Sequence, residues 1–135
     1  MRLIFLTAVL LAAVAAACGG GSAAGEAAAT RLTITVWPEG RAAGGARQWS
    51  LRCAPVGGTH PSRVKACARI AAVQNPFRPT PRDQACTQIY GGPEEARITG
   101  VFRGWKIDAR FARNDGCQIA RWDRIRVLFP VGAGT

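Results

Sequence analysis

The sequence has few of the residues on which enzymes depend. It contains one histidine, His60, and no Gly-x-Ser-x-Gly motif or paired acidic motif accompanies it. His60 stands between Thr59 and Pro61, where a helix can begin. At such a position an imidazole more often caps the helix or forms a structural hydrogen bond than performs catalysis. We therefore predict no catalytic residues and no enzyme.

The sequence also lacks the cysteine spacing of a zinc site. Such sites usually carry a pair of cysteines separated by two to four residues. Here every gap between successive cysteines of the presumed domain is thirteen residues or longer. We therefore predict no metal ion, and nothing else in the chain indicates a cofactor. The four cysteines concerned are Cys53, Cys67, Cys86 and Cys117.

Acidic residues are scarce relative to basic ones. The chain has 18 Lys and Arg against 8 Asp and Glu, a formal net charge of +10. Such a charge can attract nucleic acid or an anionic membrane surface. The arginines are scattered, however, as at Arg63, Arg69, Arg97 and Arg110, and never form a run. We interpret them as solvated faces of a sheet and a helix, and expect no nucleic acid as a partner.

No apolar run is long enough to span a bilayer. Residues 1–17 begin with the positive Arg2, continue as a short apolar run, and end in small residues before Cys18. This pattern is typical of an export signal. We expect an exported protein, and export favours oxidation of its thiols to disulfides.

The residues around Cys18 indicate how the protein is held outside the cell. Ala15-Ala16-Ala17-Cys18 resembles a bacterial lipobox, in which the cysteine becomes the lipidated first residue of the mature protein. Ordinary secretion after cleavage nearby is the alternative. We predict residues 18–30 as the lipidated cysteine with a Gly/Ala-rich linker, and 31–135 as the folded domain. The protein is then secreted or anchored to the outer face of the cell membrane, which it contacts only through its lipid.

Alternation of apolar residues predicts short strands, and one stretch predicts a helix opened by Pro61. The expected fold is α+β: a small two-layer domain with an antiparallel sheet of about five strands, one or two short helices and two disulfides. The expected apolar face of the helix comprises Val64, Cys67, Ala68 and Ala71. The strands are expected at Leu32, Ile34 and Val36; at Trp49 and Leu51; at Ala96, Ile98 and Gly100; at Trp105, Ile107, Ala109 and Phe111, after a hairpin tip at Arg103-Gly104; and at Ile125, Val127 and Phe129.

The stretch Ala85–Pro93 has the composition of an exposed, extended loop. Thr87 and Ile89 are β-branched and favour an extended backbone. Cys86 offers a covalent anchor, and Gly91-Gly92-Pro93 ends the extended run. An extended segment fixed at one end is the shape that a protease cleft accepts as substrate. We interpret this stretch as an inhibitory loop, with an ordinary strand edge as the alternative.

The four cysteines allow three pairings. We favour Cys53 with Cys67, which would tie a strand to the helix, and Cys86 with Cys117, which would tie the loop to the sheet. Chain entropy suggests a stabilisation of about 3 kcal/mol for the shorter bridge.

Two segments resemble the Streptomyces subtilisin inhibitor family. Cys53–Ile70 carries Cys-Ala-Pro, Gly-Thr-His-Pro and Ala-Cys-Ala in the order found in that family. Cys86–Tyr90, which reads CTQIY, is similar to the reactive-site loop of the family. The likeness extends over about 32–129 and includes weaker matches at Gly100 to Gly104, at Asn114 with Cys117, and at 127–129.

The resemblance implies that Gln88–Ile89 is the reactive bond and Gln88 the primary specificity residue. It implies the same disulfide pairing, an antiparallel sheet with two helices, and a serine protease of the subtilisin or trypsin type as partner. Members of the family are often dimers, so a homodimer is implied as well. The residues expected to contact the protease around the reactive bond are Ala85, Cys86, Thr87, Tyr90 and Gly91.

The leading hypothesis is therefore an exported serine protease inhibitor that acts through a substrate-like loop on subtilisin-like proteases. The alternative is a non-inhibitory envelope lipoprotein that keeps the fold and binds another partner. The Gly91-Gly92 exit from the loop, one residue longer than is usual in the family, favours the alternative, whereas CTQIY favours an inhibitor.

Overall fold

Alternating apolar residues form the strand β1 (Thr30–Trp37) at the centre of the sheet. Leu32, Ile34 and Val36 point from β1 into the core and are at most 3% exposed, as the alternation predicts. The computed structural model describes residues 29–131. The predicted export signal, Cys18 and nearly all of the predicted linker lie outside the described residues.

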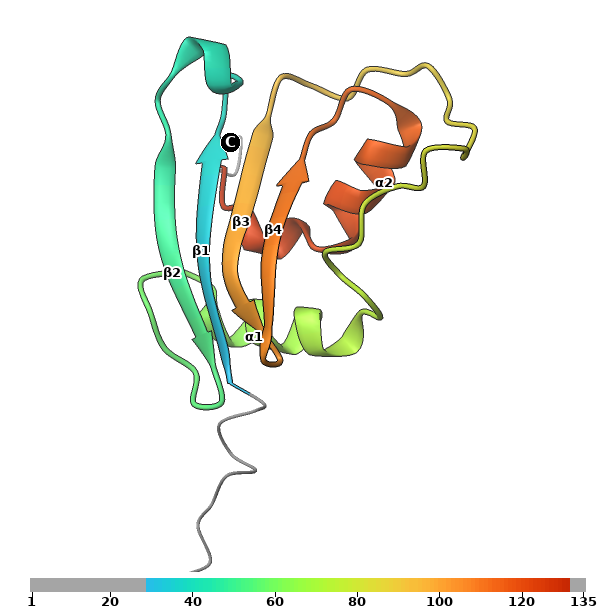
Figure 1. The fold of residues 1–135 in the computed structure, drawn as a ribbon. Coiled ribbons are helices and arrows are strands. Elements are labelled where there is room, and N and C mark those ends of the chain that lie inside the picture. Colours follow the sequence, from blue (N-terminus) through green and yellow to red (C-terminus); the bar gives the residue numbers. More distant parts are fainter. Residues whose placement is uncertain (1–28, 132–135) are drawn as a thin grey trace, which may run out of the picture.

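The other three strands extend the sheet on both sides of β1. Strand β2 (Arg47–Cys53) pairs with one edge of β1 and β3 (Glu95–Phe102) with the other, and β4 (Trp105–Phe111) pairs with β3. The order is β2-β1-β3-β4, and every pairing is antiparallel (Figure 1). Arg103-Gly104 forms the tip of the β3–β4 hairpin with φ angles of 49° and 84°, as a type I′ turn requires.

The helix α1 (Arg63–Ala72) begins close to the predicted position but buries a different face. The residues that it buries are Ala66, Cys67 and Ile70. Three of the four residues expected on that face are instead exposed: Val64, Ala68 and Ala71. Cys67 is bonded to Cys53 at the end of β2, and this bridge fixes which side of the helix faces the sheet.

The C-terminal part of the domain is helical. A second helix, α2 (Gly116–Arg124), is followed by a 3-10 turn, η2 (Arg126–Leu128). The strand predicted over 125–129 is therefore wrong, and the sheet has four strands rather than about five. Ile125 and Leu128 are both buried, and their separation by three residues matches one helical turn rather than the two-residue repeat of a strand.

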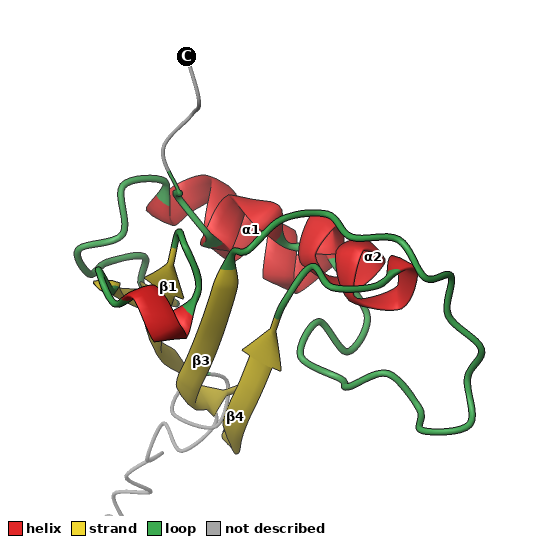
Figure 2. Cartoon of the chain, turned by 90° about the horizontal axis from the view of Figure 1, so that it is seen from above, coloured by secondary structure: helices red, strands yellow, loops and turns green. Residues whose placement is uncertain are grey.

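Both helices lie on the same face of the sheet, which gives the expected two-layer α+β fold (Figure 2). The core between the layers combines side chains of all four strands with Ile70 of α1, Trp122 of α2 and Phe129. The rings of Trp122 and Phe129 are 4.3 Å apart. Full burial of a side chain of this kind contributes about 1.5–3 kcal/mol. Among residues 29–131, no helix is both long and apolar enough to cross a membrane.

The two ends of the sheet carry different segments. Thr30, where β1 begins, pairs with Cys53 at one end, whereas Trp37 pairs with Glu95 at the other. The segment that leads into β3 therefore joins the sheet at the end opposite to the start of β1 (Figure 1). This placement separates the predicted inhibitory loop from the point at which the chain enters the domain.

Candidate functional site

The predicted inhibitory loop is an exposed segment without helix or strand. The structure places Ala85 to Tyr90 in irregular backbone, and within this stretch only Cys86 is half-buried. Ile89 is 55% exposed and Tyr90 is 72% exposed, unusually high values for large apolar side chains. An edge strand, the alternative interpretation, is not formed at this position.

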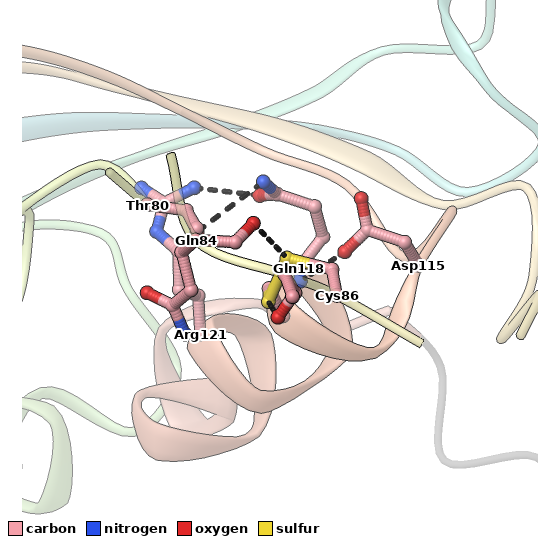
Figure 3. Close-up of a disulfide and its surroundings, with 8 residues drawn as sticks. Thr80, Gln84, Cys86, Asp115, Gln118 and Arg121 are labelled. Carbon is pink, nitrogen blue, oxygen red and sulfur yellow. Dashed lines mark hydrogen bonds between the residues drawn. A yellow bond between two sulfur atoms is a disulfide. The ribbon is translucent and has the colours of Figure 1, made fainter. Parts of the chain in front are cut away.

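A disulfide fixes the loop on the N-terminal side of the predicted reactive bond. Cys86 is bonded to Cys117, with 5.4 Å between their Cα atoms (Figure 3). The two disulfides of the structure have the pairing that we favoured from the sequence. Cys117 lies in α2, however, so the bridge ties the loop to a helix and not, as expected, to the sheet.

Two main-chain hydrogen bonds hold the loop on both sides of the predicted reactive bond. The N–H of Gly116 donates to the carbonyl oxygen of Thr87 over 2.9 Å, and the N–H of Gly91 donates to that of Arg113 over 2.7 Å. With the disulfide, all three attachments end on residues 113–117, which we call the clamp segment. Gln88 and Ile89 lie between these attachments.

The loop and α2 approach each other closely because glycine occupies the contact points. A Cβ atom at Gly116 would overlap the hydroxyl of Thr87, so a larger residue there would displace the loop. A Cβ atom at Gly91 would lie 2.8 Å from the side chain of Ile119 on α2. At both glycines the added Cβ atom would lie closer to its neighbour than an ordinary van der Waals contact allows.

An ion pair stabilises the exit from the loop. Arg113 Nη1 lies 3.0 Å from Glu94 Oε1, and both side chains are about three-quarters buried. Two buried atoms of this pair, Glu94 Oε2 and Arg113 Nε, have no hydrogen-bond partner among the described residues. The pair therefore uses one contact and not the two-point geometry that arginine can form.

The clamp segment is itself positioned by the beginning of α2. Asp115 is the N-cap, and its Oδ1 accepts a hydrogen bond from the N–H of Gln118 over 2.8 Å. Gln118 Nε2 donates to the hydroxyl of Thr80, 3.4 Å away in the segment that leads into the loop (Figure 3). The second contact connects the helix to the segment ahead of Cys86.

Arg121 forms the second connection between α2 and the segment ahead of the loop. Its Nε donates to the carbonyl oxygen of Arg78 over 3.0 Å, and its Nη1 donates to that of Arg110 on β4 over 3.1 Å. Nη1 also donates to Gln118 Oε1 over 2.8 Å. Asp115, Gln118 and Arg121 were not among the residues predicted from the sequence. The spacing Asp115-x-x-Gln118, typical of a helix N-terminus, could have revealed the first two.

The loop anchor also brings together a group that resembles a metal site. Ligand atoms of Cys86, Asp115 and Cys117 lie within 4.8 Å of one another. Cysteine binds metal as a thiolate, and these two sulfur atoms are bonded to each other. The group therefore acts as a covalent anchor.

His60 lies away from the loop and has a structural role. It is fully buried, its Nε2 lies 3.2 Å from the carbonyl oxygen of Leu128, and its Nδ1 accepts from the N–H of Ser62 over 3.1 Å. Burial lowers the pKa of the imidazole, an effect that the hydrogen bond to Leu128 opposes and the charge of Arg63 reinforces. A neutral imidazole thus joins the start of α1 to η2.

Comparison with known proteins identifies the family of the chain. A family model described as "Subtilisin inhibitor-like" matches residues 26–113. The chain is 38% identical over 88 residues to subtilisin inhibitor-like protein 5 of Streptomyces fradiae, covering 63% of this chain and 79% of the relative. It is 32% identical over 80 residues to subtilisin inhibitor-like protein 1 of Streptomyces cacaoi, covering 56% of this chain and 72% of the relative.

Among solved structures, the chain is similar to a crystal structure of Streptomyces caespitosus sermetstatin in complex with Bacillus licheniformis subtilisin. The TM-score is 0.49 and the identity 18%, over 75% of this chain and 97% of the other. The two disulfides of the present chain are consistent with an extracellular protein. On the family match and the two curated relatives, the chain belongs to the subtilisin inhibitor-like family, a family of protease inhibitors and not of enzymes.

Proposed function

We propose that this protein inhibits subtilisin-like serine proteases by presenting Gln88–Ile89 as a substrate-like reactive bond. One observation carries the proposal: Gln88 and Ile89 are exposed, and residues on both sides of their bond are attached to the same clamp segment, 113–117. Exposure makes the bond accessible to a protease cleft. Attachment keeps it in one conformation.

The first step is binding of the loop in the cleft as a substrate would bind. Ala85 to Gly91 contact the protease, and the carbonyl of Gln88 enters the oxyanion hole. Because the loop is held before binding, the protease spends little binding energy on ordering it. The hydrogen bond between Gly91 N–H and Arg113 supports this interpretation at the Gly91-Gly92 exit, where the sequence alone suggests a looser chain.

The second step determines whether the loop is an inhibitor or a substrate. If the protease cleaves Gln88–Ile89, the acyl side stays attached through Cys86–Cys117 and the bond from Gly116 to Thr87. The amine side stays attached through Gly91 and Arg113. The new amine of Ile89 therefore stays close to the acyl carbon at high effective concentration, and resealing competes with hydrolysis.

The side chain of Gln88 favours a particular class of target. It is uncharged and of medium length, so it suits the broad primary pocket of a subtilisin-like protease better than the acidic pocket of a trypsin-like one. Its exposure leaves the side chain available to that pocket.

Titration of subtilisin with the purified protein tests the proposal. We expect peptidase activity to fall linearly to near zero at one equivalent, with the chain recovered intact or cleaved only at Gln88–Ile89. Undiminished activity, or rapid cleavage at several bonds, would contradict the proposal and favour the non-inhibitory alternative.

A further inference from the structure

A hollow of about 460 Å³ lies between α2 and the segment that precedes the inhibitory loop. Three arginines contribute to its wall, Arg78 from that segment and Arg121 and Arg124 from α2. Polar side chains, two prolines, an alanine and the Cys117 end of the disulfide form the rest of the wall, and no acidic residue of the described part of the chain lines it. The hollow is therefore a concave site with positive charge on two sides.

Among the residues that the structure describes, these arginines have no carboxylate partner. Within residues 29–131 the structure contains two ion pairs, Arg97–Asp108 and Arg113–Glu94, and neither involves the hollow. Arg124 Nη2 donates to the carbonyl oxygen of Gln74 over 3.1 Å, and Arg121 donates only to carbonyl or amide oxygens. Hydrogen bonds to neutral oxygens position a guanidinium group without neutralising its charge.

The proximity of the two helical arginines is electrostatically unfavourable. Burial, and secondarily the positive charge of Arg124, lower the pKa of the Arg121 guanidinium from its ordinary value. A bound anion would offset both effects, because it would provide opposite charge where solvent access is reduced.

We propose that this hollow binds an oxyanion of the phosphate or sulfate type. Guanidinium groups are planar forks whose geometry matches such oxygens, and three of them line this one hollow. The anion would lie between α2 and 78–84, so it would join the helix to the segment that enters the loop. The site is independent of the reactive bond.

A second hollow suggests where the anionic group originates. It has a volume of about 340 Å³, shares Arg124 with the first, and is lined by Lys65, Arg69 and Arg126 together with one acidic residue, Asp123. A chain of phosphate groups could thus continue from the first hollow across Arg124 into the second. A small free anion would use the first hollow alone.

Binding can be measured by thermal denaturation and calorimetric titration of the purified protein without a protease. At constant ionic strength, pyrophosphate should raise Tm saturably by several degrees, whereas chloride should not. Arg78→Gln and Arg124→Gln should each weaken binding about tenfold, since each removes one charge-assisted contact. The matched control is Arg47→Gln, an exposed residue of β2 at the opposite edge of the sheet.

Two results would overturn the site: no saturable binding of pyrophosphate, or an equal loss of affinity in Arg47→Gln, which would indicate diffuse attraction to net charge. The calorimetric titration is carried out on folded protein, so a less stable variant still reports its affinity. Long-chain polyphosphate identifies the source of the anion. If Arg126→Gln weakens polyphosphate binding but not pyrophosphate binding, the ligand is polymeric; if it weakens neither, the ligand is a small free anion, and both results support the site.

Discussion

The residues of the inhibitory loop divide into those that attach it and those that remain available. Thr87 and Gly91 use their main-chain groups to bind the clamp segment, and Cys86 uses its sulfur. In the described part of the chain, Gln88 and Ile89 make no comparable hydrogen bond. A substitution at Gln88 should therefore change the choice of protease without changing the fold.

Gln88→Lys should make the protein an inhibitor of trypsin. The lysine would enter an acidic primary pocket, where a buried charge pair replaces an amide contact. The measurement is titration of trypsin and subtilisin with parent and variant. Gln48→Lys, on β2, adds the same charge away from the loop and is the matched control. Rapid cleavage of Gln88→Lys by trypsin would show that the position is right but that the loop is too mobile to inhibit.

Gln88→Pro provides the opposite test at the same position. Proline removes the N–H and fixes φ near −65°, so the segment should no longer fit a protease cleft as a substrate does. Inhibition of subtilisin should be lost while the circular dichroism spectrum stays that of the parent. Parent-like inhibition by both Gln88 variants would place the binding surface elsewhere.

The buried His60 should make the free energy of unfolding depend on pH. Its Nδ1 accepts a hydrogen bond from Ser62, so protonation of this nitrogen would break that bond, and burial already lowers the pKa below the ordinary value of 6.5. As the pH falls below about 6.5, the unfolded chain takes up a proton that the folded one does not. The free energy of unfolding should therefore decrease as the pH falls from about 7 towards 5.

Comparison of Tm against pH in the parent and in His60→Gln measures this effect. The variant should have a lower Tm at neutral pH because it loses packing, yet a shallower slope between pH about 7 and 5, where few other groups titrate. Equal slopes in both proteins would mean that His60 does not contribute to the pH dependence.

At the scale of secondary structure, four of the five predicted strands formed, whereas the position of the second helix was not predicted. Leu32, Ile34 and Val36 alternate with polar residues because one face of β1 is buried, and that pattern is visible in the sequence. Ile125 and Phe129 belong to an apparent alternation too, yet Ile125 ends α2 and packs with Leu128. A short apolar run of this kind fits a strand or a helical turn, and tertiary packing decides between them.

Removal of the disulfide between the loop and α2 should turn the protein from an inhibitor into a substrate. In Cys86→Ala with Cys117→Ala, the acyl side of a cleaved loop would keep only one attachment to the clamp segment, the hydrogen bond between Thr87 and Gly116. We expect subtilisin activity to fall and then recover as the variant is hydrolysed at Gln88–Ile89. Mass spectrometry of the mixture over time follows the cleavage.

The other disulfide, Cys53–Cys67, provides a control, because its removal should lower the stability of the fold by a similar amount. The bridges span 31 and 14 residues, so their loss destabilises the fold by about 4 and about 3 kcal/mol in the chain-entropy model. Cys53→Ala with Cys67→Ala should therefore lose comparable stability but remain an inhibitor at a temperature where it is folded.

Gly116→Ala tests the connection between the loop and α2 without removing a disulfide, because its methyl group displaces Thr87. Its control is Gly57→Ala, whose methyl group has its nearest contacts with the flexible side chain of Arg52. If Gly116→Ala inhibits as the parent does, the clamp segment does not determine inhibition.

At the scale of the whole molecule, and apart from the two disulfides, the sequence did not predict which residues distant along the chain lie close together in the fold. The arginines are scattered along the chain, which is why the sequence suggested only solvated faces. Folding brings Arg78, Arg121 and Arg124 to one hollow, because α2 packs against the segment that leads into the loop. The clamp segment was likewise not predictable, since it depends on where α2 begins relative to β3 and β4.

The overall arrangement also bears on the predicted lipid anchor at Cys18. The chain enters the domain at Thr30, at the end of the sheet opposite to the segment that carries the loop. An anchor ahead of Thr30 would therefore leave the reactive bond directed away from the membrane. A protease in solution could then bind the anchored protein.

We accordingly predict that the protein fractionates with membranes and inhibits subtilisin while it is attached. A bacterial lipoprotein carries more than one acyl chain, and stable anchoring requires this because a single chain binds only weakly. Cys18→Ala should move the protein to the soluble fraction without changing its titration of subtilisin, since the loop does not depend on the anchor. Fractionation, sequencing of the mature N-terminus and titration of washed membranes provide the measurements. A mature N-terminus other than Cys18, or a Cys18→Ala protein that stays with the membranes, would contradict lipidation. Attached protein that inhibits only after detergent release would contradict the outward orientation of the loop.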